Sequence, residues 1–238
     1  MIALYLRRGM AAGLLAGLLA GLFAFVVGEP LLDRAMGLEA SGHHEENAAG
    51  GEEEVFGRTT QKVGLFFATG LSGTFFGGLF GLTFAYFRGR LASKSDWGRS
   101  VSLAAAVFAG VALIPFIKYP ANPPTVGDPE TIGVRTAAYF TMVGLSLLAI
   151  LAAWYASRLL EERGVSPPVR HVAVGLGLVV VVIGLFVTLP ATANPGSFPA
   201  GLLWSFRLSS LGTQLVLWAG LGVLFGALCE RANRKDSF

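Results

Sequence analysis

The chain has 238 residues, of which 53% are hydrophobic and 14% are charged, whereas a typical soluble domain has about 25% charged residues. So few charges cannot cover the surface of a water-soluble protein, which excludes an ordinary soluble enzyme, a disordered chain and a coiled coil. The single cysteine excludes an intrachain disulfide and a paired-cysteine metal site. The net charge of +3 comes without a basic run interleaved with aromatic residues, so nothing indicates nucleic-acid binding. A polytopic membrane protein remains.

Six apolar segments approach or exceed the length of about 20 residues that a helix needs to cross a membrane. Their apolar runs are continuous rather than alternating, which favours helices over a transmembrane β-barrel. The sequence therefore predicts an all-α fold, a membrane helical bundle formed by one domain over residues 1–238. The predicted spans are residues 10–27, 63–87, 101–117, 137–156, 172–189 and 208–228, and residues 29–62 form an acidic external loop with two histidines.

Lysines and arginines are unevenly distributed between the two predicted faces of the membrane. The face richer in these residues is usually cytoplasmic, so both termini are predicted in the cytoplasm, as six spans require. The predicted location is the cytoplasmic membrane. Of the 18 residues, twelve fall on the cytoplasmic side, namely Arg7, Arg8, Arg88, Arg90, Lys94, Arg99, Arg158, Arg163, Arg170, Arg231, Arg234 and Lys235; the other six are Arg34, Arg58, Lys62, Lys118, Arg135 and Arg207.

Glycines recur every four residues in the first, second and sixth spans. Small residues at this spacing form a flat stripe on a helix, which lets two backbones approach closely. Two interpretations stay open: tight packing within the bundle, or a surface for a partner helix. The stripes are Gly9, Gly13, Gly17 and Gly21; Gly73, Gly77 and Gly81; and Gly222 and Gly226.

A proline follows each outgoing span, at Pro30, Pro120 and Pro190. Proline cannot continue the hydrogen-bond ladder of a helix, so each is predicted to stop its helix. The chain is therefore expected to form three out-and-back helical hairpins. The second and third share a Pro-Ala…Asn-Pro turn and run in the same direction, which suggests a parallel internal repeat.

Two polar segments carry candidate metal ligands. Imidazole and carboxylate groups suit borderline divalent ions such as Co²⁺ and Ni²⁺, and the first loop contains His43, His44, Glu45 and Glu46. The alternative there is a solvated acidic loop that binds no metal. Asp128 and Glu130 offer oxygen ligands in the second loop, where the alternative is helix capping and turn formation by Asp128.

No catalytic site is predicted. Residues 70–73 match the GxSG pattern of rhomboid proteases, but a serine nucleophile needs a nearby base. None of the three histidines falls on a span at the depth of Ser72. Helix packing explains this serine better, and neither an enzyme activity nor a bound cofactor is expected.

The last two external turns are expected to fold together at the mouth of the bundle. Arg135 and Arg207 are predicted to anchor them by pairing with carboxylates or carbonyls, since a cation would repel a metal ion. Gln214 is expected to face the bundle interior, because its amide is costly in lipid. The residues assigned to this mouth are Lys118, Pro120, Asn122, Pro123, Arg135, Asn194, Pro195, Arg207 and Gln214.

The same turns carry a resemblance to a known family. KYPANPPTVGDPETIGVRT (Lys118 to Thr136) and FPAGLLWSFRLSSLGTQ (Phe198 to Gln214) resemble the signature segments of the predicted cobalt transporter subunit CbtA family, as does GLLAGLLAG near the start. The resemblance implies cobalt uptake together with a small one-span partner, CbtB, that has a histidine-rich end. It also implies an acidic residue where this chain has Gly201.

The leading hypothesis is a Co²⁺ uptake permease subunit. The chain has no GxxxxGK[ST] motif, so transport would be channel-like, secondary or energised by a partner. Two alternatives stay open: a transporter of another divalent metal such as nickel, and a non-transporting membrane scaffold or assembly factor. A homo-oligomer is also compatible with the sequence.

Overall fold

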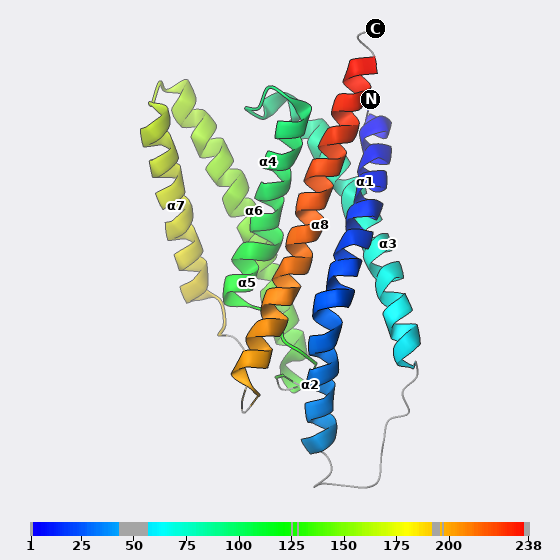
Figure 1. Cartoon of the computed structure of the whole chain (residues 1–238). Helices are drawn as coiled ribbons and strands as arrows, with labels where there is room; N and C mark the ends of the chain where they lie inside the picture. Colours follow the sequence, from blue (N-terminus) through cyan, green and yellow to red (C-terminus); the bar gives the residue numbers. More distant parts are fainter. Residues whose placement is uncertain are drawn as a thin grey trace. The chain divides into compact units, whose positions relative to one another are not determined.

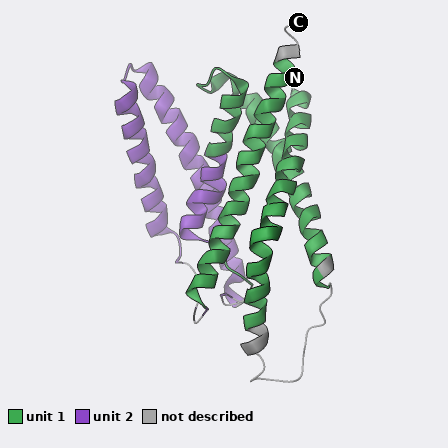
Figure 2. Cartoon of the chain, viewed as in Figure 1, with its two compact units in different colours: residues 1–105, 122–125, 199–238 green, residues 106–121, 126–198 purple. Residues whose placement is uncertain are grey.

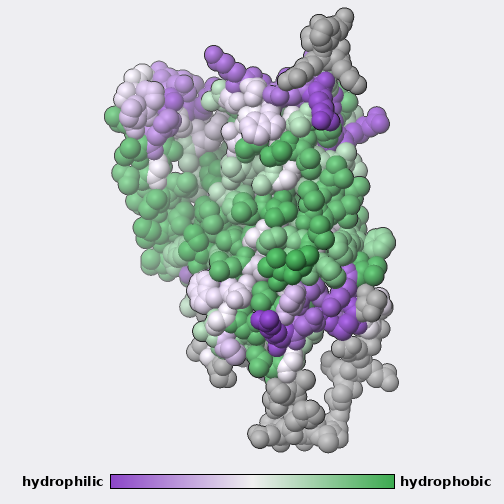
Figure 3. Space-filling view, viewed as in Figure 1, coloured by the Kyte–Doolittle hydropathy of each residue, from purple (hydrophilic) through white to green (hydrophobic). Residues whose placement is uncertain are grey.

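The computed structural model describes residues 2–42, 57–124, 126–127, 129–191, 196 and 198–235. Six helices in these ranges are long and apolar enough to cross a membrane: Ile2–Leu38, Thr60–Arg90, Asp96–Lys118, Ile132–Glu162, Pro167–Thr188 and Ala200–Asn233. On the face drawn in Figure 3, apolar side chains cover the middle of the helices and polar side chains gather toward their ends. The predicted all-α fold with six spans is confirmed.

The chain divides into two compact units (Figure 2). Unit 1 comprises residues 1–105, 122–125 and 199–238, and unit 2 comprises residues 106–121 and 126–198. The boundary falls inside the third span. The helices, labelled in Figure 1, are α1 (Ile2–Phe23), α2 (Glu29–Gly42), α3 (Arg58–Phe87), α4 (Asp96–Phe108), α5 (Ile114–Lys118), α6 (Ile132–Glu162), α7 (Pro167–Thr188) and α8 (Ala200–Lys235).

In unit 1, α1 packs against both α3 and α8. The start of α1 and the end of α8 lie at one end of the unit, here called its terminal end, and α2 lies at the opposite, turn end (Figure 1). Glycines make the contact between α1 and α3 so close that a Cβ atom built on Gly13 would lie 2.0 Å from the carbonyl oxygen of Gly73. The two glycine stripes therefore face each other, which confirms tight packing within the bundle.

The rest of the core of unit 1 combines aromatic, leucine and small side chains. Phe84 of α3 and Phe225 of α8 are fully buried, and their rings meet edge to face with centroids 4.9 Å apart. Gly222 lets α8 approach α4, where the buried Ser100 hydroxyl donates a hydrogen bond to the Gly222 carbonyl at 2.7 Å. The third glycine stripe thus also serves contacts within the chain.

Two π-helical turns keep long helices continuous across a proline. One, at Ala24–Gly28, joins α1 to α2, and the other, at Ala109–Leu113, joins α4 to α5. A proline ring clashes with the carbonyl four residues earlier. For Pro30 and Pro115 that carbonyl, of Val26 and Val111, lies inside the π-helical turn, whose wider winding relieves the clash.

The prediction that the first helix stops before Pro30 was therefore wrong. The helix continues to Gly42, so the predicted loop over residues 29–62 is helical at its start, and again from Arg58 onward. The other two prolines behave as expected, because α5 ends at Lys118 before Pro120 and α7 ends at Thr188 before Pro190.

In unit 2, α6 packs against α7, against α5 and against the preceding π-helical turn. Gly110 in that turn makes room for α6, since a Cβ there would lie 2.8 Å from Cδ2 of Leu147. No residue of α7 is buried. The two spans expected to form the third hairpin, over residues 172–189 and 208–228, fall in different units.

Candidate functional site

The second predicted external turn begins where two helices of unit 2 end together. The Lys118 ammonium, at the end of α5, donates a hydrogen bond to the Phe186 carbonyl at 2.7 Å. Phe186 lies in the last turn of α7, whose carbonyls have no partner within the helix. A cation at a helix C-terminus is also favoured by the helix dipole. Lys118 therefore caps α7 from a neighbouring helix.

Tyr119, which the sequence analysis did not single out, makes a second link to the same region. Its hydroxyl donates a hydrogen bond to the Pro190 carbonyl at 2.8 Å. Burial raises the pKa of the Tyr119 phenol above its usual value of 10.0, because it disfavours the charged form. The phenol thus stays neutral and keeps its proton for this bond. In the sequence, the only signal for this role of Tyr119 was its position between Lys118 and Pro120.

In unit 1, Asn122 and Arg207 join segments that are distant in sequence. Arg207 donates from Nη2 to the Asn122 side-chain oxygen at 2.8 Å, and its guanidinium lies 5.3 Å from the centre of the Trp204 ring. The next residue, Pro123, is fully buried. The predicted anchor at Arg207 therefore has a side-chain amide as its partner, and this occupies the Asn122 oxygen.

Gly127 and Arg135 are matched to each other in unit 2. Gly127 has φ of +108°, a conformation that disfavours any residue with a side chain. A Cβ at this position would lie 2.2 Å from Nη1 of Arg135, so the space is filled as well. Arg135 also donates to the Val126 carbonyl at 3.5 Å. The turn needs glycine for two independent reasons.

A cluster of four charged residues at the turn end of unit 1 was missed by the sequence analysis. Glu29 and Asp33 lie one turn apart on α2, and Arg58 and Lys62 lie one turn apart on α3. Nη2 of Arg58 lies 2.9 Å from Oε2 of Glu29 and also contacts Asp33, and Nζ of Lys62 lies 3.5 Å from Oδ2 of Asp33. The matched four-residue spacings were the available signal, but the segment was taken for a loop.

Most of the predicted metal ligands lie outside the described residues: His43, His44, Glu45, Glu46 and Asp128, as do the turn residues Asn194 and Pro195. Glu130 is exposed, in a short 3₁₀ turn at Pro129–Thr131. Pro120 is half-buried after the end of α5. Nowhere in the described part of the chain do three His, Cys, Asp or Glu side chains gather as a metal site would require.

Gln214 departs from its predicted position. Its side chain is exposed rather than turned into the bundle, and its amide oxygen accepts a hydrogen bond from Nε1 of Trp218 at 3.2 Å. Trp218 lies one turn further along α8 and is buried. The buried indole needs an acceptor, and the glutamine supplies it from the outer side of the helix.

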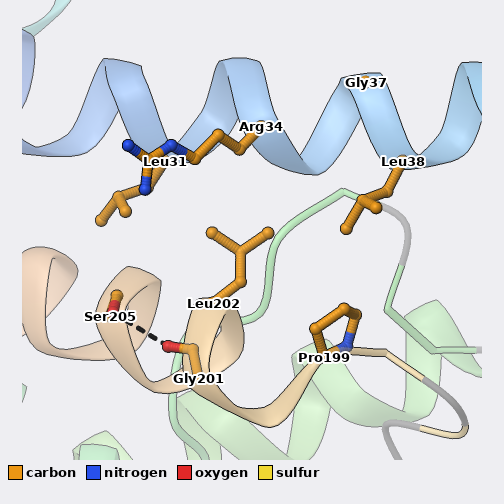
Figure 4. A pocket seen from close by; sticks show the side chains of 8 residues that line it. All are labelled: Leu31, Arg34, Gly37, Leu38, Pro199, Gly201, Leu202 and Ser205. Carbon is orange, nitrogen blue, oxygen red and sulfur yellow. Dashed lines mark hydrogen bonds between the residues drawn. The ribbon is translucent and has the colours of Figure 1, made fainter.

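A groove of about 470 Å³ opens at the turn end of unit 1, between α2 and the start of α8 (Figure 4). Its walls are mostly apolar, with Arg34 as its one charged side chain. Gly201, where the family resemblance implies an acidic residue, lies here, and its carbonyl accepts a hydrogen bond from Ser205 at 2.9 Å. The lining residues are Leu31, Arg34, Gly37, Leu38, Pro199, Gly201, Leu202 and Ser205.

Comparison with known proteins gives one clear relationship. A protein-family model described as "Probable cobalt transporter subunit (CbtA)" matches residues 2–230, which is nearly the whole chain. Comparisons with curated proteins and with solved structures found no match. The matched range contains all six membrane helices almost completely and both turns on which the resemblance was based. This multi-pass membrane protein therefore belongs to the CbtA family of probable cobalt transporter subunits.

Proposed function

We propose that this protein is the permease subunit that carries Co²⁺ across the cytoplasmic membrane into the cell. The observation that carries the proposal is the family match over residues 2–230, together with six helices long enough to cross a membrane. Because the chain lacks a P-loop motif, the ion follows a channel-like or secondary route, or a partner subunit supplies the energy.

The proposed ligands are those with the appropriate donor chemistry. Asp128 and Glu130 would offer carboxylate oxygens to the arriving ion, and the exposed position of Glu130 is compatible with this role. The segment of His43, His44, Glu45 and Glu46 would collect ions at low external concentration. A loosely held ion suits this task, since conduction requires binding that is favourable enough for entry and weak enough for release.

The neighbouring polar residues are assigned a positioning role. Lys118 and Arg207 each donate to an oxygen of the protein, and the Asn122 oxygen is taken up by Arg207. Asn122 is therefore not proposed as a metal ligand. These bonds hold the turns that follow α5 and precede α8, so that their loss should alter transport through the shape of the turns.

The most direct test is cobalt accumulation in cells that lack their own cobalt uptake. We expect the chain, alone or with its genomic neighbour, to raise accumulation above that of an empty vector. Asp128→Asn, which keeps the size of the side chain and removes its charge, should lower uptake with unchanged expression. Glu162→Gln, at the other end of α6, is the matched control. No accumulation in any combination would contradict the proposal and favour a scaffold.

A second experiment separates cobalt from nickel. Excess Ni²⁺ should reduce Co²⁺ accumulation only weakly if the system prefers cobalt, whereas a nickel transporter would show the reverse competition. The His43→Ala and His44→Ala double variant should reduce uptake at low external cobalt and leave it unchanged at high cobalt. An equal loss at every concentration would argue against ion collection by this segment.

The proposal includes a topology and a partner. Reporter fusions after Lys94, after Ser166 and at the C-terminus should all report the cytoplasm, as the distribution of Lys and Arg predicts. The proposed partner is a small one-span protein with a histidine-rich end, detectable by co-purification. One argument for the scaffold alternative was that the glycine stripes could bind a partner helix. The stripes of α1 and α3 instead contact each other within the chain, so they no longer favour that alternative.

A further inference from the structure

A polar pocket of about 300 Å³ lies at the terminal end of unit 1, where the chain passes from α3 into α4 and where α8 ends. It is distinct from the turns discussed above, and it was not predicted from the sequence. Three cations line it, Arg88, Lys94 and Arg99, together with two carboxylates, Asp96 and Glu230, and the amide of Asn233.

One carboxylate fixes the position of two of the three cations. Asp96 is buried, and its Oδ1 accepts hydrogen bonds from Nε of Arg88 at 2.8 Å and from Nη1 of Arg99 at 2.9 Å. Its Oδ2 accepts from Nη2 of Arg88 at 2.7 Å and from Asn233 at 2.8 Å. Four donors therefore occupy this carboxylate, and both guanidinium groups are held before any ligand arrives.

Positive charge remains after Asp96 has been satisfied. One carboxylate serves two guanidinium groups, and Lys94 adds a third cation that makes no ion pair within the described residues. Glu230 is the only other acidic side chain in the lining, so the cations outnumber the carboxylates by three to two. In addition, Nε of Arg99 is buried and has no hydrogen-bond acceptor among the residues that the structure describes. A buried donor without a partner is destabilising, so an acceptor within reach of this arginine would be favourable.

We propose that this pocket binds a phosphate-type oxyanion, presented either by the headgroup of an anionic phospholipid or as free phosphate. Guanidinium groups match the geometry of phosphate oxygens and form paired, charge-assisted hydrogen bonds with them. Basic pockets between membrane helices are also known sites for anionic headgroups. The proposal does not depend on the identity of the transported ion.

The binding test uses the full chain purified in a neutral detergent, with the thermal unfolding midpoint followed during titration. The ligands are short-chain phosphatidic acid, phosphatidylcholine with the same acyl chains, and inorganic phosphate. We expect phosphatidic acid to raise the midpoint and phosphatidylcholine to leave it unchanged. A rise with inorganic phosphate as well identifies a free-phosphate site, and a rise with the lipid alone identifies a lipid site. No response to either anion overturns the proposal.

Two substitutions with opposite expected effects assign the binding to this pocket. Lys94→Gln removes one cation without touching Asp96, and it should weaken anion binding about fivefold, since a basic residue near a phosphate contributes on the order of 1 kcal/mol. Glu230→Gln removes the opposing carboxylate and should tighten binding by a similar factor.

Arg90→Gln is the matched control. Its guanidinium lies 4.4 Å from the centre of the Tyr86 ring and donates to the Tyr86 carbonyl, and the residue does not line the pocket. It should leave the affinity within about twofold of the wild type. If Arg90→Gln and Lys94→Gln weaken binding equally, or if Glu230→Gln fails to tighten it, the anion responds to overall charge and the pocket is not its site.

Discussion

Two pairs of neighbouring helices in this protein pack by opposite means. Between α1 and α3, glycine stripes bring the backbones into contact, as at Gly13 and Gly73. Between α6 and α7, an apolar cleft of about 520 Å³ remains, and Gly175 of α7 has no atom within 4 Å of the position that a Cβ would take. Each of these two pairs lies within one unit. Glycine content alone therefore does not produce close packing.

The difference lies in spacing and in what the partner offers. The glycines of α1 repeat every four residues and meet glycines of α3 with the same repeat, so two flat surfaces face each other. The glycines of α7, at 175, 177 and 184, follow no such repeat, and α6 presents leucine and alanine side chains to that helix. Close contact requires matched stripes on both helices.

The largest effect is expected when a methyl group is added to the glycine stripe of α1, which tests whether the close packing depends on glycine. Gly13→Ala would place a Cβ against the Gly73 carbonyl, which is backbone and cannot rotate away. We expect a loss of about 3 kcal/mol or more and little folded protein. Folded yield and the unfolding midpoint in detergent measure this, and a variant as stable as the wild type would refute the contact.

A smaller effect is expected at the polar end of the tightly packed unit. Asp96→Ala leaves Arg88 and Arg99 without their shared carboxylate and should cost about 2–3 kcal/mol, less than a fully buried pair because both arginines are partly exposed. Glu162→Gln, which removes an exposed carboxylate, should be neutral. Chemical unfolding of the two variants should show this contrast, and equal stabilities would contradict it.

In the loosely packed unit, the hydrogen bond between Lys118 and the end of α7 should have a smaller effect, confined to that helix end. Lys118→Met removes the hydrogen bond to the Phe186 carbonyl and should cost about 1 kcal/mol. Hydrogen exchange should rise in the last turn of α7 and stay unchanged in α1. A rise spread evenly over both helices would mean that Lys118 stabilises the whole chain rather than this helix end.

The hydrogen bond from Tyr119 to the Pro190 carbonyl, just after α7, should contribute a stability that depends on pH. Tyr119→Phe removes the hydrogen bond to Pro190, with an expected cost of up to about 1 kcal/mol at neutral pH. Because the pKa of Tyr119 is raised above 10.0 in the folded protein, its contribution is complete below pH 10.0 and is lost as the pH rises through the raised value. Stability curves of wild type and variant should therefore converge at high pH, and parallel curves would contradict this.

The smallest effect is expected at a glycine of α7. Gly175→Ala introduces the same methyl group as Gly13→Ala but meets no atom within 4 Å. It should leave stability unchanged or raise it by less than about 1 kcal/mol, since alanine favours helix over glycine. A destabilisation comparable to that of Gly13→Ala would show that α7 contacts a surface that is absent from the single chain.

Local patterns in the sequence predicted the parts of the fold that depend on local physics. Apolar length identified all six spans, and the four-residue glycine repeat identified the close contact of α1. Arg207 was expected to pair with a carboxylate or a carbonyl, and its guanidinium donates to the side-chain oxygen of Asn122, a residue assigned to the same external mouth. These successes reflect chemistry carried by a few adjacent residues or by one helical face.

The remaining features depend on residues that are far apart in the chain. Arg88 and Arg99 lie close to Asp96 in the chain, but the fourth donor to its carboxylate, Asn233, comes from α8, 137 residues later. Gln214 was misplaced because the cost of its amide in lipid was considered without the indole of Trp218. Neither the division of the chain into two units nor the packing of α7 on α6 follows from the order of the spans, since it is decided by which faces fit each other.

The π-helical turn at Ala24–Gly28 also changes the direction in which the side chains of α2 point relative to those of α1. Such a turn accommodates one residue more than the α-helix would, and one residue corresponds to about 100° of rotation around the helix axis. The side chains of α2 are therefore rotated by that angle about the helix axis, compared with an unbroken α-helix. With this rotation, Glu29 and Asp33 face Arg58. The direction of the acidic pair on α2 is thus set separately from that of the glycine stripe on α1, although both lie on one continuous helix.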